Sequence, residues 1–425
     1  METATGILPR MRVPKPSTYR SCAVLWLSAS MMCLPARAAT PSGTFINTTY
    51  YPLTGDVVPY RITAGPDGAM WFTIFKGDQI GRITTAGVVT QYPVPTPYSQ
   101  PEGIVAGPDG ALWFAESANL KIGRITTAGA ITEYQLPSSG QPAEIAAGPD
   151  GALWFTEAIG NQVGRITVSG AVTEYPVPTP NSSPGGIAVG PDSALWFTEL
   201  SANQIGRITT AGVITEYPID VSKGSEPESI AAGPDGALWF TQRAGESIGR
   251  ITTAGAVTDY PAYSAYPEWI TAGSDGALWF TATGTVARIT TSGVVTSYAI
   301  HRGPYVKGIA AGPDGALWFT RSPSASIGRM PACGLGFSAT FANGALTMNF
   351  DLGVDEPATF DILLRTSTGT DVPFSLAIPA VVPPNTFTMN WSAVPNLGEV
   401  VVQPALSAGP GQSLCSEWTT VNTAQ

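Results

Sequence analysis

Glutamates at two recurring positions are the residues of this sequence best suited to chemistry. The chain repeats one short pattern seven times, and the two positions lie two residues before an Ile and three residues after a Trp. Copies two to six each carry a carboxylate at one position or at both, whereas copy seven carries Lys307 and Arg321. Strands that are antiparallel neighbours begin and end at the same edge, so we expect both positions to face one funnel. The carboxylates are Glu102, Glu116, Glu157, Glu199, Glu228 and Glu268.

Three acidic residues near this predicted funnel could form a metal site. Carboxylate oxygens are the preferred ligands of Mg²⁺ and Ca²⁺, so Glu226, Glu228 and Glu268 are candidate ligands. Crowded like charges also raise carboxyl pKa values, which would suit Glu228 or Glu226 to act as a catalytic base. The alternative is a solvated acidic rim, in which Lys307 and Arg321 neutralise the carboxylates. We favour this alternative, and the identity of a cofactor stays open between Mg²⁺, Ca²⁺ and none.

Aromatic residues gather near the same positions and predict a binding surface. Flat aromatic side chains at the mouth of a funnel suit an apolar or ring-bearing ligand. We therefore expect a small aromatic or cyclic-peptide ligand, or else a protein partner. The charged residues Glu102, Glu268, Lys307 and Arg321 would border this surface. The aromatic residues are Tyr60, Tyr98, Tyr263, Tyr266, Trp269 and Tyr305.

The repeat that positions these residues has a period close to 42 residues. Seven Trp-Phe pairs follow one another at intervals of 39–43 residues, a spacing typical of stacked β-sheet units. In the copy that spans residues 103–134, four short strand-like runs are separated by turns rich in Gly, Pro and Asp. Four short antiparallel strands per unit, repeated radially, form a β-propeller. The pairs begin at Trp71, Trp113, Trp154, Trp196, Trp239, Trp279 and Trp318.

The number of strands indicates how the ring closes. The first three strands of the unit occur seven times and end at Arg329, but a fourth strand follows only six of them. A seventh copy of the fourth strand, residues 44–51, lies ahead of the first unit. We therefore expect an all-β, seven-bladed β-propeller that the N-terminal strand closes by completing the last blade. An open solenoid would leave this strand unpaired.

Residues that occur in every unit are expected to maintain the blade rather than to perform chemistry. The Trp-Phe pairs should pack between blades, and the Asp of each turn should cap its own hairpin. One Arg per unit should donate hydrogen bonds between neighbouring blades. These arginines are Arg82, Arg124, Arg165, Arg207, Arg250, Arg288 and Arg329.

The first 38 residues have the composition of a secretory signal peptide. Four basic residues between Arg10 and Arg20 precede an apolar segment at 22–34, and Ala36-Arg37-Ala38 fits a cleavage site. We therefore predict a secreted or periplasmic monomer without a membrane anchor, whose propeller spans residues 39–331. The net charge of −10 provides no electrostatic footprint for nucleic acid.

Residues 332–425 depart from the repeat and predict a small C-terminal β domain. Alternating residues at 337–341 and 346–350 flank Asn343-Gly344, which is a typical hairpin turn. Four further strand-like runs follow, so we expect a β-sandwich-like domain that caps the propeller or binds a glycan or a partner. Cys333 and Cys415 remain after the leader is removed, and an even pair in an oxidising compartment predicts a disulfide.

The amino-acid sequence of the repeat, for example at residues 190–217, resembles that of the streptogramin B lyases, the virginiamycin B lyase family. The resemblance extends over residues 44–331 and implies a seven-bladed enzyme that opens an antibiotic macrolactone by Mg²⁺-dependent elimination. It also implies a catalytic His after a Pro at the start of a strand, with Glu residues that hold the metal. Tyr60 matches a funnel Tyr of the family. No copy here has His after that Pro: Glu226-Pro227-Glu228 is the nearest match, and the only histidine, His301, lies in a predicted loop.

Two functions are compatible with these features. The first is a secreted ligand- or partner-binding propeller without lyase activity, which we favour because a propeller fold does not by itself carry a reaction. The second is an Mg²⁺-dependent carbon–oxygen lyase that opens a cyclic depsipeptide, or a related hydrolase. In the second case Glu228 or Glu226 would replace the missing His as the base.

The predicted disulfide can be tested by mass spectrometry of exported protein. We expect a digest made without reduction to yield the Cys333 and Cys415 peptides as one cross-linked species. Closing a loop of about 80 residues would stabilise the protein by roughly 4 kcal/mol, which favours the bonded form. A reduced digest is the control, and free thiols in protein from an oxidising compartment would contradict the pairing.

Overall fold

The structure is a computed structural model that describes most of residues 44–331. The described residues are 44–45, 48–220, 225–262, 266–300 and 305–331, together with seven strands between 338 and 422. The predicted signal peptide, Tyr263, His301, Cys333 and Cys415 lie outside the described residues, so the predictions that rest on them stay predictions. Across the described ranges, no helix is long and apolar enough to cross a membrane.

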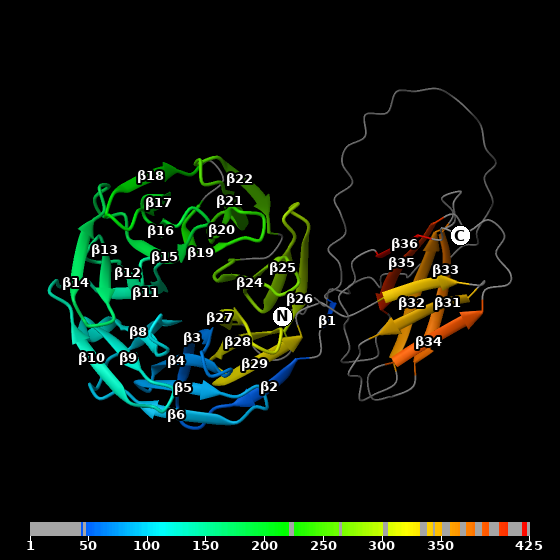
Figure 1. The fold of residues 1–425 in the computed structure, drawn as a ribbon, viewed down its shortest axis with the longest axis horizontal. Helices are drawn as coiled ribbons and strands as arrows, with labels where there is room; N and C mark the ends of the chain where they lie inside the picture. Colours follow the sequence, from blue (N-terminus) through cyan, green and yellow to red (C-terminus); the bar gives the residue numbers. More distant parts are fainter. Residues whose placement is uncertain are drawn as a thin grey trace, which may run out of the picture. The chain divides into compact units, whose positions relative to one another are not determined.

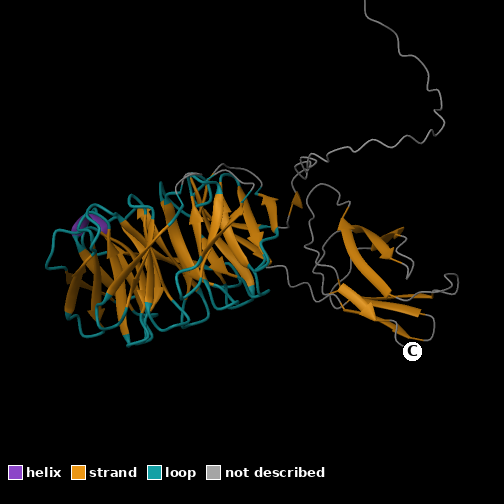
Figure 2. Ribbon diagram, turned by 90° about the horizontal axis from the view of Figure 1, so that it is seen from above, coloured by secondary structure: helices purple, strands orange, loops and turns teal. Residues whose placement is uncertain are grey.

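Seven antiparallel sheets are arranged around a central axis, which confirms the seven-bladed β-propeller (Figure 1). In each blade the first strand is innermost and the fourth is outermost, as β3 and β6 show. Seen from the side, the loops run along two opposite faces of the ring (Figure 2). The strands of blades one to four are β3 (Val58–Ala64), β4 (Met70–Lys76), β5 (Gln79–Ile83), β6 (Val89–Pro93), β7 (Pro101–Ala106), β8 (Leu112–Glu116), β9 (Lys121–Ile125), β10 (Ile131–Gln135), β11 (Pro142–Ala147), β12 (Ala152–Glu157), β13 (Gln162–Thr167), β14 (Val172–Pro176), β15 (Pro184–Val189), β16 (Leu195–Glu199), β17 (Gln204–Ile208) and β18 (Ile214–Pro218).

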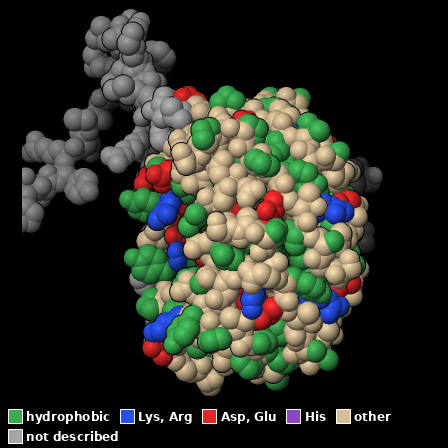
Figure 3. Space-filling model, turned by 90° about the vertical axis from the view of Figure 1, so that its left-hand side faces the viewer, with side chains coloured by type: hydrophobic (Ala, Val, Ile, Leu, Met, Phe, Trp, Pro, Cys, Tyr) green, Lys and Arg blue, Asp and Glu red, His purple; other side chains and the backbone are tan. Residues whose placement is uncertain are grey.

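The remaining three blades follow the same order, and one short 3-10 helix, η1 (Ser117–Asn119), follows β8. On the side of the ring drawn in Figure 3, charged side chains occur in small separate groups among uncharged ones. The strands of blades five to seven are β19 (Pro227–Ala232), β20 (Leu238–Gln242), β21 (Ser247–Ile251), β22 (Val257–Pro261), β23 (Ile270–Ala272), β24 (Leu278–Ala282), β25 (Thr285–Ile289), β26 (Val295–Ala299), β27 (Tyr305–Ala311), β28 (Ala316–Ser322) and β29 (Ser326–Pro331).

The N-terminal segment closes the ring, as the strand count predicts. β2 (Thr49–Pro52) pairs antiparallel with β29 and becomes the outer strand of blade seven. Its Tyr51 ring stacks on Trp318 with 5.6 Å between centroids, the same contact that a fourth-strand Tyr makes in the other blades. The predicted single strand is divided in two, because β1 (Thr44–Phe45) pairs in parallel with β26 of blade six. The chain therefore bridges two blades before it completes the ring.

Tryptophan and phenylalanine side chains fill the space between neighbouring blades. Trp71 of blade one is fully buried and packs with Leu112 and Phe114 of blade two. At the closing seam, Trp318 of blade seven packs in the same way against Phe72 of blade one. Fully buried aromatic side chains contribute a large apolar area each, so these contacts hold the ring together. The predicted packing between blades is confirmed.

Each of these indole rings has its N–H satisfied by the Asp of the adjacent turn. Asp67 accepts a hydrogen bond from Trp71 Nε1 at 2.9 Å, and its second carboxylate oxygen accepts one from Arg82 Nε at 2.7 Å. The Asp–Arg ion pair lies within one blade, so the sequence prediction that these arginines bond between blades is wrong. The same Trp–Asp–Arg set occurs in all seven blades.

Buried acid pairs stand at the end of the second strand in blades two, three and four. The second-strand Glu is fully buried in each case, although the sequence places it in the funnel. Burial is the largest cause that raises its pKa, and the charge of the fourth-strand Glu raises it further. A carboxyl group that keeps its proton can donate a hydrogen bond to the neighbouring carboxylate. The pKa values are about 8 for Glu116 beside Glu133, about 7 for Glu157 beside Glu174 and about 7 for Glu199 beside Glu216.

Blade five has a Gln and an Asp at the two positions where blades two to four have a pair of Glu residues. Its second strand ends in Gln242, whose Nε2 donates a hydrogen bond to the fourth-strand Asp259. A neutral amide therefore serves as the donor in blade five, whereas in blades two to four the raised pKa of the second-strand Glu favours the protonated carboxyl group.

Beyond the propeller the described strands form two sheets. Their orders are β30-β31-β34 and β33-β32-β35-β36. The domain boundary at residue 332 and the sandwich-like arrangement stay predictions. The strands are β30 (Ser338–Ala342), β31 (Ala345–Phe350), β32 (Ala358–Arg365), β33 (Asp371–Ile378), β34 (Asn385–Asn390), β35 (Glu399–Leu406) and β36 (Thr419–Asn422).

Deleting residues 40–52 should destabilise the whole ring. The deletion removes β2 and with it two tyrosine side chains that pack on blade seven, at a cost of about 3–6 kcal/mol, and it exposes the edge of β29. We expect aggregation or a lower Tm in thermal unfolding followed by circular dichroism. Deletion of residues 40–43 alone is the matched control. An unchanged Tm in the longer deletion would contradict closure by the N-terminal strand.

Glu199→Gln should stabilise the protein in alkaline solution and have little effect in acid. Because the folded state raises the pKa of Glu199 from 4.5 to about 7, it binds this proton more tightly than the unfolded chain does. The free energy of unfolding therefore falls as the pH rises between these two values and stays lower above them. We expect a gain of about 1–2 kcal/mol at pH 8 in urea unfolding, and almost none at pH 4.5.

Gln242→Glu in blade five is the matched control and should lose a similar amount at pH 8. Equal effects of Glu199→Gln at both pH values would show that Glu199 does not hold a proton in the folded protein.

Candidate functional site

The first strand of six blades begins with a β-bulge that opens toward the central channel. In blade five, Pro227 pairs with Gln242 and Ile230 pairs with Phe240, so Glu228 and Ser229 together face a single residue, Thr241. The same register shift occurs in blades one, two, three, four and seven. A bulge inserts one extra residue into a strand, so two successive side chains no longer point to opposite faces of the sheet. It therefore brings two residues of each first strand to the channel instead of one.

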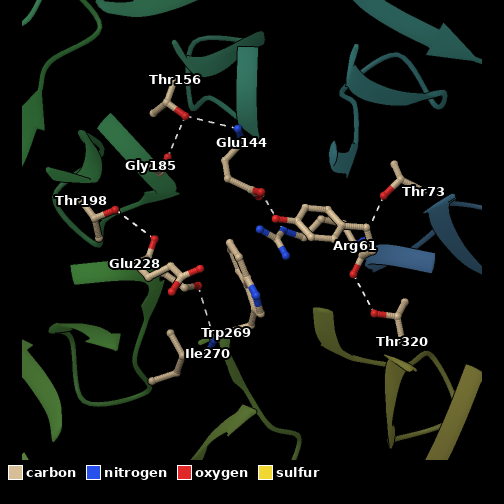
Figure 4. A network of polar contacts seen from close by, with 12 residues as sticks. Arg61, Thr73, Glu144, Thr156, Gly185, Thr198, Glu228, Trp269, Ile270 and Thr320 are labelled. Atoms are coloured by element: carbon tan, nitrogen blue, oxygen red, sulfur yellow. Dashed lines mark hydrogen bonds and ion pairs between the residues drawn. The ribbon is translucent and has the colours of Figure 1, made fainter. Parts of the chain in front are cut away.

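The threonine opposite the bulge joins blades three, four, five and seven each to the next blade. Thr241 Oγ1 accepts a hydrogen bond from Ser229 N at 3.1 Å and donates one to the carbonyl oxygen of Glu268 in blade six at 2.8 Å. At the closing seam, Thr320 Oγ1 donates to the carbonyl oxygen of Tyr60 at 2.7 Å (Figure 4). These bonds fix the main chain at both residues that border the channel.

The residue just before the repeated Ile decides how much of the channel is filled. In blades two, four and seven this residue is Gly, and a Cβ at Gly103 or Gly308 would lie 2.7 Å from a carbonyl oxygen of the next blade. No larger residue fits there without displacing the neighbouring strand. Blades one, three and six instead carry Arg61, Glu144 and Trp269, whose side chains extend into the channel (Figure 4).

Arg61 connects three blades across the channel. Its Nε donates to Glu144 Oε1 of blade three at 2.7 Å, and its guanidinium group lies over the ring of Trp269 of blade six. The same group is 4.4 Å from the centre of the Tyr60 ring. Figure 4 shows the guanidinium group between the Glu144 carboxylate and the indole ring. Arg61 and Trp269 are 7% and 8% exposed, so this cluster is a built part of the channel.

Burial raises the pKa of several acidic groups around Arg61. Burial raises the pKa of Glu144, while the adjacent Arg61 opposes the shift. The pKa of Glu102 rises to about 7, first because the group is buried and second because Glu144 is close. Burial likewise raises the pKa of Tyr60 to about 12, so its hydroxyl keeps its proton at neutral pH. We therefore describe the cluster as one ion pair surrounded by groups that are neutral or partly neutral.

Glu228 and Glu268 lie on the neighbouring side of the channel, where cations face them. Lys307 Nζ of blade seven is 2.8 Å from Glu268 Oε2, and Arg243 Nε is 4.0 Å from Glu228 Oε2. The pKa of Glu228 rises to about 6, chiefly by burial and then by the charge of Glu268. Arg243, Arg61 and Lys307 oppose the rise.

The structure brings together some of the residues that the sequence singles out, and separates others. Tyr60, Glu102, Glu228, Glu268, Trp269 and Lys307 belong to the channel cluster by the contacts above. Arg321 is only 4% exposed and lies over the ring of Tyr50, away from the channel carboxylates. Glu226 is exposed, and Tyr266 and Tyr305 are 53% and 50% exposed.

The described residues give no support to a divalent metal site. Among the described residues, no three His, Cys, Asp or Glu side chains are grouped closely enough to hold one. Glu268 is bonded to Lys307, and Glu226 is exposed while Glu228 is largely buried. The predicted Mg²⁺ or Ca²⁺ site at Glu226, Glu228 and Glu268 therefore stays a prediction, and we derive no step through a metal.

Sequence reasoning missed the two residues that form the central ion pair, Arg61 and Glu144. Regular alternation assigns only the residue two before the Ile to the funnel, and the bulge adds the residue one before it. A comparison of that position among the seven copies would have found them, because it reads Arg61, Gly103, Glu144, Gly186, Ser229, Trp269 and Gly308.

Solved structures similar to this chain include streptogramin-degrading enzymes. The virginiamycin B lyase from Staphylococcus aureus is 40% identical, with 67% of this chain and 99% of that chain covered and a TM-score of 0.64. A catalytically inactive His-to-Ala variant of that lyase, solved with quinupristin, is 39% identical with the same coverage and TM-score. A streptogramin B lyase structure is 37% identical, with 66% and 96% covered and a TM-score of 0.63.

Sequence relatives and the family profile agree with these structures. The virginiamycin B lyases of Bordetella parapertussis and Mycolicibacterium smegmatis are 45% and 49% identical over 42 and 43 residues. These matches, about one blade long, cover 10% of this chain and only 14% and 15% of those proteins. The profile of the virginiamycin B lyase family matches residues 23–225 and 220–335, which include the whole propeller. The chain therefore belongs to the virginiamycin B lyase family.

Proposed function

We propose that this member of the family is a secreted or periplasmic ligand-binding propeller without lyase activity. One observation carries the proposal: Glu144 and Glu268, two of the channel carboxylates, form close ion pairs, with Arg61 and Lys307. A carboxylate that is already paired with a cation is a poor metal ligand, because binding the metal would first require breaking that pair. The channel is thus organised for charge neutralisation and not for holding a free cation.

The lack of a histidine after the Pro of any first strand supports the same proposal. The inactive relative of Staphylococcus aureus differs by a His-to-Ala replacement, whereas this chain has a single His, His301, and none after the Pro of any first strand. Glu228 and Glu268 stand at that position in blades five and six. A lyase without its base would keep the binding surface of its ancestor and lose the reaction.

The ligand that we propose is a cyclic peptide or another molecule with an aromatic ring. The edge-to-face pair of Tyr60 and Trp269, with centroids 6.4 Å apart, provides an aromatic wall beside the channel. Phe75 extends this wall, 5.7 Å from Tyr60. The exposed rings of Tyr266 and Tyr305 would add contacts at the rim of the same binding face.

A lyase or hydrolase that uses Glu228 as base is the second candidate. The pKa of about 6 for Glu228 is close to the value that suits a general base at neutral pH. In this case the carboxylate would take a proton from the bound ligand, and burial together with the charge of Glu268 would raise its pKa. Arg243, 4.0 Å away, would limit its basicity.

Incubation with quinupristin and Mg²⁺ separates the two candidates. We expect calorimetry to detect binding and mass spectrometry to recover the antibiotic unchanged, because this chain has no His after the Pro of any first strand. The Staphylococcus aureus lyase is the positive control for turnover. Ring opening by the wild-type chain that disappears in Glu228→Gln would contradict the binding-protein proposal and establish the lyase.

Magnesium binding provides an independent measurement. We expect no saturable binding of Mg²⁺ at millimolar concentration in calorimetry, since Glu268 is held by Lys307. Lys307→Met, which releases this carboxylate, is the variant in which a weak site could appear.

A further inference from the structure

Trp269 differs from the seven repeated tryptophans in one respect. Each repeated indole N–H donates to an Asp within 2.9–3.1 Å. Trp269 Nε1 is buried, yet it has no hydrogen-bond partner among the described residues. A buried N–H without an acceptor costs about 1–3 kcal/mol, so a fold that satisfies seven indoles is expected to satisfy the eighth. An acceptor from outside the chain would do so.

Arg61 also carries a buried N–H donor that has no hydrogen-bond partner among the described residues. Its Nε is bonded to Glu144, but Nη1 is buried and finds no partner in the part of the chain that the structure describes. The guanidinium carbon of Arg61 lies 2.7 Å from the centre of the Trp269 ring, so the two free N–H groups belong to side chains in direct contact. Two adjacent donors of this kind suit one oxygen acceptor, which can accept two hydrogen bonds.

The surrounding charges select a neutral acceptor over an anion. Three cations face four carboxyl groups around this position, so the cluster carries a net negative charge when all the carboxyl groups are ionised. The charge of Arg61 is already balanced by Glu144 at 2.7 Å. A ligand carboxylate or phosphate would add repulsion, whereas an uncharged carbonyl oxygen would not. The groups are Arg61, Arg243, Lys307, Glu102, Glu144, Glu228 and Glu268.

We propose that Arg61 Nη1 and Trp269 Nε1 form a donor pair that binds an uncharged carbonyl oxygen, such as that of an amide or ester group of the ligand. The proposal rests on the binding function above and adds the chemical group that the channel recognises. The pair is specific to this chain's blades one and six, because the corresponding positions of blades two, four and seven are Gly and that of blade five is Ser.

Nuclear magnetic resonance of the full chain labelled with ¹⁵N at the tryptophan indoles tests the donor pair. Trp269→Phe, which keeps an aromatic ring but removes the N–H donor together with the five-membered ring of the indole, assigns the Trp269 signal. N-methylacetamide is the neutral probe, and acetate is the anionic control of similar size. We expect a saturable shift of the Trp269 indole N–H with the amide and none with acetate at pH 7.5.

Arg61→Lys retains the charge at this position and removes the planar fork, so it should weaken the response to N-methylacetamide about tenfold. The seven repeated indole signals report whether each variant is folded, since their Asp partners are remote from Arg61. No response to either probe, as a permanently held water molecule would give, overturns the proposal. An equal response to acetate, which would indicate a general anion site, overturns it as well.

The titration also separates this proposal from the proposed function. If N-methylacetamide shifts Trp269 but quinupristin does not bind, the donor pair stands and the choice of ligand is wrong. If quinupristin binds without moving the Trp269 signal, and with equal affinity to Trp269→Phe, the ligand stands and the donor pair is wrong.

Discussion

The burial of seven indole rings is the constraint on which the propeller depends. Each ring fills the space between two blades and is fully buried, so its N–H must find an acceptor inside the protein. An Asp in the adjacent turn provides it, and an Arg from the third strand holds the other oxygen of that Asp. The hydrogen bond from the Trp, and then the contacts with the Arg, hold the pKa of the Asp below its usual value, against the effect of burial. The repeat is therefore a solution to one hydrogen-bonding requirement, applied seven times.

The channel differs from the blades because the need to satisfy the buried indole N–H groups does not determine which side chains line it. The threonines at the bulges satisfy the main chain at the channel edge, which leaves the side chains free to vary from blade to blade. Glycine is required where neighbouring first strands approach most closely, as at Gly103 and Gly308. Elsewhere the chain places Arg61, Glu144 and Trp269, and Arg61 and Glu144 form an ion pair between blades one and three. Function in this fold is thus carried by departures from the repeat.

Most of the fold was predictable from the sequence, because Trp-Phe spacing and turn residues report local structure directly. The closing strand was predictable as well, since a count of strands needs no knowledge of side-chain direction. The channel was only partly predictable: Glu228, Glu268 and Lys307 follow from alternation, whereas Arg61 and Glu144 depend on a bulge that the sequence does not mark. Glu116 was placed in the funnel by the same alternation, whereas the structure buries it beside Glu133 of its own blade. The arginines of the third strand were assigned to the wrong partner, since spacing alone does not distinguish a bond within a blade from one between blades.

The closure of the ring has a consequence for the order in which the protein is assembled. Thr49 pairs with Arg329, so a strand that leaves the ribosome or a translocation channel early needs a partner in β29, the last propeller strand to emerge. Bringing together segments about 280 residues apart has an entropic cost that grows slowly with the length between them. During this interval β2 and its tyrosines are an unpaired edge. A chain that stops before β29 keeps that edge exposed, so a protease that recognises open strands could remove incomplete products and spare the finished ring.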